Sequence, residues 1–295
     1  MKCGTIAVLG RPNVGKSTLV NALVKQKIAI VSEKPQTTRT RILGVAHLPG
    51  AQLAFLDTPG LHQPWYRLNQ RMVQRALEAI TVADILTVMV DARRLPGPED
   101  RAVLDQIFRS GNVSSPLPCF LLVNKVDLIP KPQVLPVIEA YANLGMWTEI
   151  IPLSAKCGLN MDRLVDLLIK QLPEQEPGYN DETVTDQPLR QFAAEVVREK
   201  VLAQTKAELP YAVAVKVDEF VEHERLVHIR ASIVVDKPGQ KAIVIGKRGL
   251  RLKTIGMAAR LELEQEVGKP VFLELYVKVH KAWRDDPRML AEFGY

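Results

Sequence analysis

The first 171 residues alternate short apolar runs with longer stretches that carry apolar residues at helical spacing. A short continuous apolar run is typical of a buried strand, and the longer pattern is typical of an amphipathic helix. The strands predicted in this way span residues 5–9, 41–46, 52–56, 85–90, 119–123 and 149–152. The alternation predicts an α/β domain with a mostly parallel sheet that helices cover on both faces. Ligands of such sheets bind at the carboxyl ends of the strands, so polar residues just after the strands are the first candidates for a site.

The pattern changes after residue 171. Residues 172–188 contain acids, prolines and a glycine but no Lys or Arg, which is typical of a linker. Beyond them, the apolar positions predict a helix, two strands, two helices and a last strand. We therefore predict an α/β domain at 1–171, a linker at 172–188 and a smaller α+β domain at 189–295.

Composition and charge limit which class of protein this is and which partners it can bind. The 295 residues are 47% hydrophobic and 24% charged, which is ordinary for a globular chain of two domains. The net charge of +6 suits a polyanionic partner without proving one. The three cysteines form no C-x-x-C pair, so the sequence suggests neither a zinc site nor a disulfide framework. We see no signal peptide and no apolar run long enough to cross a bilayer, and we expect a protein that is soluble or at most peripheral to a membrane.

The strongest motif follows the first predicted strand. Residues 10–17 read GRPNVGKS and match G-x-x-x-x-G-K-[ST], a loop whose backbone N–H groups cradle phosphates. Lys16 is expected to reach the outer phosphates and Ser17 to ligate Mg²⁺. The helix that follows adds the positive end of its dipole. The nucleotide-binding residues predicted here are Gly10, Arg11, Pro12, Asn13, Val14, Gly15, Lys16, Ser17 and Thr18.

Two further loops lie downstream of Lys16, at a spacing that suits contacts to Mg²⁺ and to a terminal phosphate. Residues 36–39 read QTTR, and one of the two threonine hydroxyls is expected to complete the Mg²⁺ shell when a third phosphate is present. Residues 57–60 read DTPG, where the carboxylate is placed to hold the metal through water and the glycine N–H to reach a terminal phosphate. D-x-x-G alone is a weak signal, because many turns look alike. The residues of this loop are Asp57, Thr58, Pro59 and Gly60.

Residues 124–127 read NKVD and select the base. The Asp127 carboxylate can accept hydrogen bonds from the ring N–H and the exocyclic amine of guanine, and adenine offers neither donor there. A site built around such a pair rejects a base without the donors by roughly 10⁴ or more. This argues against the alternative, a nucleotide kinase or ATPase. The base-side residues predicted are Asn124, Lys125, Asp127, Ser154, Ala155 and Lys156.

The second domain carries the sequence GKRG at residues 246–249, which matches the G-x-x-G loop that clamps single-stranded backbone in KH domains. Five Lys or Arg and no acid lie between residues 241 and 253. The alternative is that this module docks a protein or a membrane partner. The RNA-binding residues predicted are Gly246, Lys247, Arg248, Gly249, Arg251 and Lys253.

For the remaining candidate residues, the sequence predicts no chemical role. None of the five histidines pairs with another His or Cys at ligand spacing, so we expect them in packing or at the surface. Trp283 is equally suited to stacking on a base and to a core. Asp91, Arg93 and Arg94 are expected to form a solvated loop at a strand end.

The motifs at 10–17, 36–39, 57–60, 124–127 and 154–156 occur in the order seen in translation-factor-type GTPases. Together with the second domain, the chain resembles the Era GTPases over nearly its full length. That resemblance implies a GTPase domain followed by a type II KH domain. It also implies a GTP/GDP switch that binds 16S ribosomal RNA near its 3′ end and acts in assembly of the 30S small ribosomal subunit. We expect a cytoplasmic monomer with some peripheral membrane association.

The resemblance also assigns catalytic roles. It implies that Thr38 is the threonine that ligates Mg²⁺, together with Ser17 and Asp57. Leu61 stands where Ras-like proteins place a water-orienting glutamine, so it is expected to turn away, with a slow intrinsic rate. Asn13 is expected to help hold K⁺, which would stimulate turnover. The catalytic residues predicted are Lys16, Thr38, Gly60 and Asn13.

Overall fold

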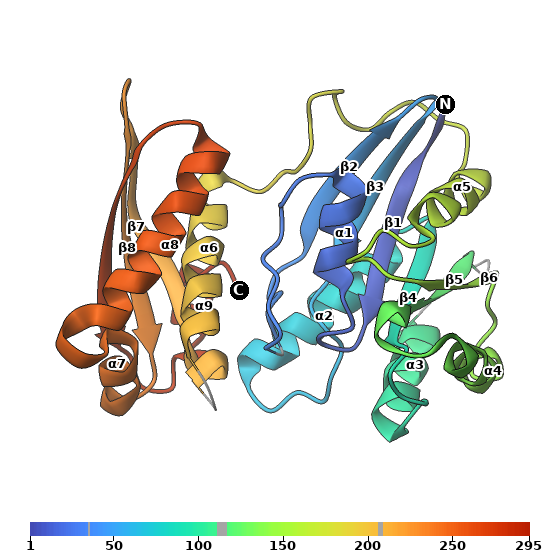
Figure 1. The fold of residues 1–295 in the computed structure, drawn as a ribbon, viewed down its shortest axis with the longest axis horizontal. Helices are drawn as coiled ribbons and strands as arrows, with labels where there is room; N and C mark the ends of the chain where they lie inside the picture. The colour runs from blue at the N-terminus through green and yellow to red at the C-terminus, as the bar shows by residue number, and fades with distance from the viewer. Residues whose placement is uncertain (35, 111–116, 206–208) are drawn as a thin grey trace. The chain divides into compact units, whose positions relative to one another are not determined.

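The computed structural model describes residues 1–34, 36–110, 117–205 and 209–295 (Figure 1). Its contacts divide the chain into two compact units. Unit 1 comprises Met1–Ala29, Thr38–Pro64 and Asn69–Asp186, and unit 2 comprises Ile30–Thr37, Trp65–Leu68 and Gln187–Tyr295. Among the described residues, no helix is both long enough and apolar enough to cross a membrane.

Unit 1 is built on a six-stranded sheet in the order β2-β3-β1-β4-β5-β6. Every strand pair is parallel except β2 with β3, so the predicted mostly parallel sheet is confirmed. Each of the predicted strands is present. Their bounds are β1 Lys2–Gly10, β2 Ile42–Leu48, β3 Ala51–Asp57, β4 Ile85–Asp91, β5 Cys119–Asn124 and β6 Glu149–Leu153.

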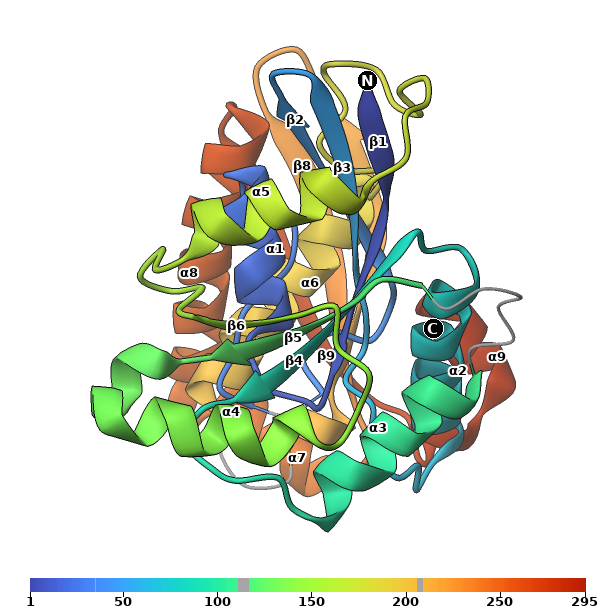
Figure 2. The same cartoon turned by 90° about the vertical axis from the view of Figure 1, so that its right-hand side faces the viewer.

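Helices cover both faces of this sheet (Figure 2). Side chains of α1 and α5 pack on one face with Ile6 and Val8 of β1, and side chains of α2, α3 and α4 pack on the other with Ala7 and Leu9. A strand buried on both faces needs apolar residues at consecutive positions, which explains the continuous runs in the sequence. The helix bounds are α1 Lys16–Val24, α2 Arg67–Thr81, α3 Pro98–Ser110, α4 Val134–Ala142 and α5 Met161–Gln171.

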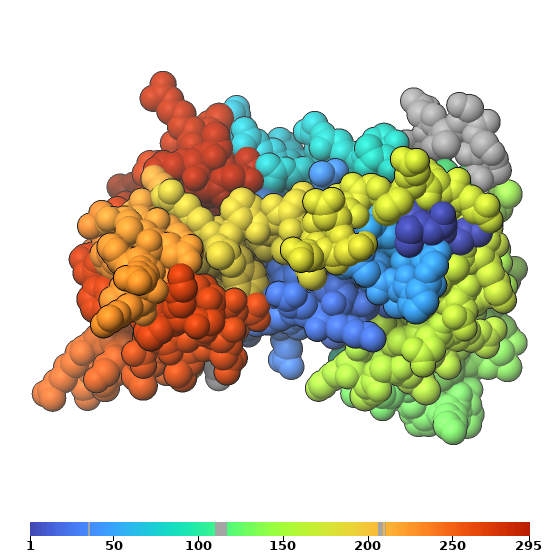
Figure 3. Space-filling view, turned by 90° about the horizontal axis from the view of Figure 1, so that it is seen from above, coloured from blue at the N-terminus to red at the C-terminus, as the bar shows by residue number. Residues whose placement is uncertain are grey.

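The segment after α5 runs along the edge of the sheet. The Gln52 side chain bonds both ways with the backbone of Tyr179, at 2.7 and 3.1 Å, and the Val45 N–H donates to the Val184 carbonyl at 2.8 Å. Figure 3 shows the segment in yellow beside the dark blue N-terminus. Residues 179–184 therefore lie against β3 and the otherwise open edge strand β2, and the whole segment 172–186 belongs to unit 1.

Unit 2 has the predicted order of helix, strand, strand, helix, helix and strand, which is confirmed. Its sheet has the order β7-β8-β9, with β7 and β8 antiparallel and β8 and β9 parallel. Helices α6 and α8 pack together on one face of it (Figure 1). The bounds are α6 Leu189–Gln204, β7 Ala214–Glu222, β8 Val227–Val235, α7 Pro238–Ile245, α8 Leu250–Val267, β9 Val271–Val279 and α9 Pro287–Glu292.

Trp283 lies in the core of unit 2. Its side chain is fully buried, its Nε1–H donates to the Ala212 carbonyl at 2.9 Å, and its ring meets Phe293 edge-on. Of the two alternatives left open by the sequence, the structure therefore supports packing and not base stacking.

Candidate functional site

The phosphate loop joins β1 to α1 at the carboxyl edge of the sheet, and its two glycines are required by geometry. Gly10 has φ +138° and Gly15 has φ +110°, which side chains rarely adopt. A Cβ on Gly10 would stand 2.3 Å from the Met89 carbonyl oxygen, and one on Gly15 would stand 2.3 Å from Asn124 Nδ2. The loop therefore packs tightly against the neighbouring strands, with the N-terminus of α1 directly behind it.

Lys16 is buried inside this loop. Its ammonium donates to the carbonyls of Arg11 at 2.9 Å and Gly10 at 3.2 Å. Burial lowers the pKa of Lys16 to about 8, although the nearby Asp57 carboxylate opposes the shift. A buried ammonium favours an anion nearby, and the hydrogen bonds that the structure shows for Lys16 go to neutral carbonyls, which leaves room for an anion in the loop.

A group of three oxygen-bearing side chains lies beside Lys16. The Ser17 hydroxyl donates to Asp57 Oδ2 at 2.6 Å, the hydroxyls of Ser17 and Thr38 lie 2.8 Å apart, and Thr38 Oγ1 is 3.3 Å from the same carboxylate. Thr37 instead donates to the Lys34 carbonyl. Thr38, the threonine assigned by resemblance, is thus the one that lies at the carboxylate.

This group fits Mg²⁺. Asp57 is fully buried, and its Oδ1 has no hydrogen-bond partner among the described residues, although a buried carboxylate oxygen is rarely left unpaired. Burial raises the pKa of Asp57, against the opposing effects of Lys16 and the two hydroxyls. A cation would restore the balance, and hard oxygen ligands are those that Mg²⁺ prefers. Among the residues that the structure describes, no cluster of three or more His, Cys, Asp and Glu side chains offers another metal site.

The loop after β3 packs directly on the phosphate loop. A Cβ on Gly60 would meet the Pro12 backbone nitrogen at 2.5 Å, so only glycine fits at this point. The Thr58 hydroxyl is buried and donates to the Val8 carbonyl at 2.7 Å. Leu61 is fully buried in the core and turned away from the loop, as expected.

His62 follows Leu61 and is half-buried. Its Nδ1 lies 2.8 Å from the Gly60 carbonyl oxygen, and burial lowers the pKa of the imidazole. The histidine therefore packs locally, as the sequence analysis expected.

On the base side, Asn124 forms hydrogen bonds to both the phosphate loop and the loop at residues 154–156. Its Nδ2 donates to the Val14 carbonyl at 2.7 Å, and its Oδ1 accepts from the Ala155 N–H at 3.0 Å. Lys125 donates to the Asn13 carbonyl at 2.6 Å. The predicted base-side loops are therefore bonded to the phosphate loop.

Asp127 and Lys156 remain exposed at this end of the sheet, and Ser154 is buried beneath them. Their exposure leaves both side chains accessible to a base. The Arg11 guanidinium pairs with Glu99 and Asp100, and Thr18 lies in the first turn of α1.

The predicted RNA-binding loop joins α7 to α8 in unit 2. Gly246 and Gly249 have φ of +72° and +76°, and Lys247 and Arg248 between them are exposed. A Cβ on Gly249 would meet no atom within 4 Å, so its surface is open to a ligand backbone. Arg251 instead donates to the Ile243 carbonyl and holds the loop.

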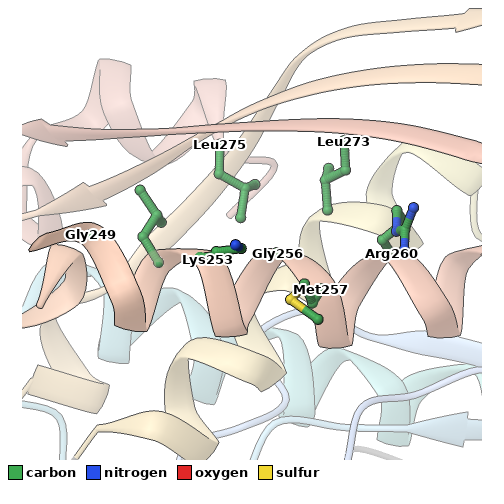
Figure 4. A pocket seen from close by; sticks show the side chains of 8 residues that line it. Gly249, Lys253, Gly256, Met257, Arg260, Leu273 and Leu275 are labelled. Carbon is green, nitrogen blue, oxygen red and sulfur yellow. The ribbon is translucent and has the colours of Figure 1, made fainter.

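A groove of about 430 Å³ runs from this loop between α8 and β9. Figure 4 shows apolar side chains of β9 on one side and helix residues on the other, among them the basic Lys253 and Arg260. The sequence did not reveal this groove in advance, although the spacing of three to four residues between its lining positions along α8 was a signal of a common helix face. Its lining residues are Gly249, Leu252, Lys253, Gly256, Met257, Arg260, Leu273 and Leu275.

Asp91 is a second residue whose place the sequence did not reveal. It was expected in a solvated loop, but its side chain is buried and accepts hydrogen bonds from Lys125 and Arg93. That expectation was wrong because the partner lysine is distant in sequence and comes alongside only when β4 and β5 pair.

Two family models match the chain. One, described as 50S ribosome-binding GTPase, matches residues 5–125, and the other, described as KH domain, matches residues 208–284. Among curated proteins, GTPase Era from Geobacter metallireducens is 47% identical over 100% of this chain and 98% of its own length. GTPase Era from Leuconostoc citreum is 43% identical over 100% of this chain and 96% of its own length.

Solved structures agree with this match. A structure of Era in complex with MgGDPNP and nucleotides 1506–1542 of 16S ribosomal RNA has a TM-score of 0.95 at 43% identity and covers 100% of this chain and 99% of its own. A variant of Aquifex aeolicus Era bound to GDP·AlF₄⁻ has a TM-score of 0.94 at 42% identity, with the same coverage. The nucleotide-loop geometry, the KH order of unit 2 and full-length relatives at this identity show that the chain belongs to the Era family of GTPases.

Proposed function

We propose that this chain binds guanine nucleotides, hydrolyses GTP to GDP and phosphate, and binds small-subunit ribosomal RNA near its 3′ end during 30S assembly. The observation that carries the proposal is the buried Asp57 Oδ1, which has no hydrogen-bond partner in the described part of the chain and lies next to a phosphate loop that is bonded to the base-side motif. Full-length relatives named GTPase Era, and an Era structure that contains a GTP analogue and 16S RNA, support it.

In the proposed mechanism, the chain positions the terminal phosphate and stabilises charge there, because phosphoryl transfer needs little else from a protein. Lys16 would turn from the loop carbonyls to the outer phosphates, where its charge opposes theirs. The Gly60 N–H would donate to the terminal phosphate, since Gly60 lies against Pro12 of the loop with no side chain between them.

Ser17, Thr38 and Asp57 would hold Mg²⁺, which bridges phosphate oxygens and neutralises developing charge when bound. With Leu61 buried, no side chain at that position orients the attacking water. The Asn13 side chain would help to hold K⁺, whose charge substitutes for an arginine finger. The intrinsic rate is therefore expected to be slow.

The base-side residues would select guanine. The exposed Asp127 carboxylate would accept from the two guanine donors, and the stems of Lys125 and Lys156 would lie against the ring. Asn124 would keep the base-side loop next to the phosphate loop, as it does in this structure.

In unit 2, the groove along α8 would hold single-stranded bases, with the glycines at its end admitting the RNA backbone. Lys247, Arg248 and Lys253 would contact phosphates. Arg251 is proposed to contribute mainly by holding the loop through Ile243.

We also propose the domain limits 1–171, 172–188 and 189–295, with the linker packed against unit 1 as far as residue 186, for a monomer that acts in the cytoplasm with some peripheral membrane association. The end of α5 at Gln171 and the start of α6 at Leu189 support these limits. Limited proteolysis checks the limits, and cell fractionation checks the location.

The enzymatic part is tested with the purified full-length protein. Phosphate release from GTP should require Mg²⁺, and binding of a fluorescent GDP should be displaced by unlabelled GDP but not by ADP. Lys16→Ala should abolish nucleotide binding. Equal displacement by GDP and ADP would contradict the assignment of the base site.

The RNA part is tested with Gly249→Asp, which places bulk and negative charge where the RNA backbone would approach. It should abolish binding of an oligonucleotide with the 3′ sequence of 16S RNA while intrinsic GTP turnover stays near wild type. Lys247→Ala and Arg248→Ala should weaken binding more mildly and flatten its salt dependence, because each phosphate contact releases counterions.

Gly268→Asp is the matched control. Gly268 has a similar φ of +69° and open space around it, but it lies at the opposite end of α8. It should therefore bear the same backbone strain and keep RNA binding. Normal RNA binding by folded Gly249→Asp would show that this loop is not the clamp.

A further inference from the structure

Asp91 is a buried acid at the end of β4, outside every motif assigned so far. Its side chain is 3% exposed. Its Oδ1 accepts from the backbone N–H of Arg93 at 3.0 Å. Its Oδ2 accepts from the Arg93 guanidinium at 2.7 Å and from Lys125 Nζ at 2.9 Å. Asp91 thus holds a lysine of the base-side motif from the neighbouring strand.

The same ammonium reaches the phosphate loop. Lys125 Nζ donates to the Asn13 carbonyl at 2.6 Å. Asn13 has φ +64°, a left-handed conformation that costs free energy for a residue with a side chain. A strong hydrogen bond to its carbonyl stabilises that conformation. Asp91, Lys125 and Asn13 therefore form one continuous chain from β4 to the phosphate loop.

The hydrogen bonds that link Asp91 to Lys125 and Arg93 also join charged groups. Burial alone would raise the pKa of Asp91, but hydrogen bonds from Arg93 and Lys125 hold it well below its usual range. Asp91 is therefore ionised at neutral pH, and both of its contacts to Lys125 and Arg93 are charge-assisted. With two acceptors fixed, the Lys125 ammonium has one position, which also fixes its stem.

We propose that Asp91 is a positioning residue for nucleotide binding, which acts by fixing Lys125 and, through it, the backbone of Asn13. The base-side and phosphate-side parts of the site are then set together before the nucleotide arrives. This inference rests on the proposed nucleotide site and adds a residue to it that contacts neither base nor phosphate.

A double-mutant cycle on the full-length protein tests this proposal, with fluorescent GDP as the probe. Asp91→Asn keeps the shape of the side chain and removes its charge, and it should weaken GDP binding about 10- to 100-fold, the range for a lost hydrogen bond between charged groups. Lys125→Met should weaken it at least as much. Since Asp91 acts through Lys125, the double variant should bind no more weakly than Lys125→Met.

A merely structural role gives a different result. If Asp91 only supported the fold, its loss would weaken binding by the same factor with or without the lysine. The proposal would be overturned if the double variant lost GDP affinity by the product of the two single-variant factors. It would also be overturned if Asp91→Asn bound GDP within threefold of wild type. If Asp91→Asn is too unstable to assay, comparison of Lys125→Met with the double variant decides, because the double variant leaves no buried charge unpaired: the Arg93 guanidinium is half-exposed.

Arg93→Ala is the matched control. It removes the half-exposed guanidinium but keeps the backbone N–H that holds Asp91 Oδ1, and Lys125 keeps its contact. GDP binding should stay within about threefold of wild type. Failure of the wild-type protein to bind GDP would refute the proposed function instead, so the two outcomes are distinguishable.

Discussion

Replacement of Asn124 by Ala tests how the base-side and phosphate-side loops are joined. Asn124 is buried, donates to the Val14 carbonyl and accepts from the Ala155 N–H. Asn124→Ala leaves both backbone groups without their partner. A buried group left unpaired costs about 1–3 kcal/mol, so the two together cost about 2–6 kcal/mol. Water can enter beside the loop and hydrogen-bond to the freed backbone groups, which favours the lower end of this range, about 2–3 kcal/mol.

The cost of the lost hydrogen bonds should be seen partly as a lower unfolding free energy and partly as a weaker GDP affinity. The bonds exist before nucleotide binds, so unit 1 of the Asn124→Ala variant should unfold at lower denaturant than wild type. Nucleotide must also reassemble the two loops on binding, which should weaken GDP affinity roughly 30- to 150-fold if the whole cost falls there. Isothermal titration or fluorescent-GDP displacement measures the affinity, and urea unfolding of the free protein measures the stability.

Asn21→Ala is the matched control. The Asn21 side chain bonds three backbone groups at residues 28 and 29, and none of these three bonds involves the phosphate loop. This variant should also lose stability but should keep GDP affinity within about threefold. Wild-type GDP affinity in Asn124→Ala, or an equal loss in Asn21→Ala, would refute the reasoning.

Three further outcomes follow from the structure. GDP affinity should fall about tenfold per pH unit above pH about 8, because Lys16 of the nucleotide-free protein then loses its proton, and an affinity that does not change with pH would contradict the burial of Lys16. Between pH 8 and 10.5, the ordinary pKa of lysine, the unfolded chain still binds that proton, so the unfolding free energy of the nucleotide-free protein should rise with pH. Turnover should be slow, on the order of 10⁻⁴ s⁻¹ without a partner, and faster in K⁺ than in Na⁺ at matched ionic strength; equal rates rule out the role of Asn13. Gly44→Ala should cost about 1–3 kcal/mol of unfolding free energy, because its Cβ would stand 2.5 Å from Ile28 Cδ1, whereas Gly178→Ala, with nothing within 4 Å, should cost almost nothing; equal unfolding curves would contradict this packing.

The sequence predicted the strands of unit 1 well, because strands buried on both faces must be continuously apolar. It also predicted which residues lie in the phosphate loop and beside it, because motifs that follow parallel strands meet at one edge of the sheet. Thr38 was selected over Thr37 only through resemblance. The structure agrees, because Thr37 is bonded to Lys34 while Thr38 faces Asp57.

What the sequence could not predict depends on contacts between distant residues. Asp91 looked like a surface acid until the pairing of β4 and β5 brought Lys125 beside it. Trp283 could not be assigned because burial depends on the Ala212 carbonyl and the C-terminal rings. The acidic composition of residues 172–186 gave no sign that part of their backbone would lie against an edge strand.

Asp127→Asn tests the central claim, a guanine-specific nucleotide site, most directly. Xanthine carries a carbonyl where guanine carries an amine, so an amide at position 127 can donate to it. GTP affinity should fall by roughly 10⁴, and affinity for xanthosine triphosphate should rise in its place, with Mg²⁺-dependent turnover of the new nucleotide. If the variant keeps full GTP affinity and gains none for xanthosine triphosphate, this edge of the sheet does not bind guanine as described.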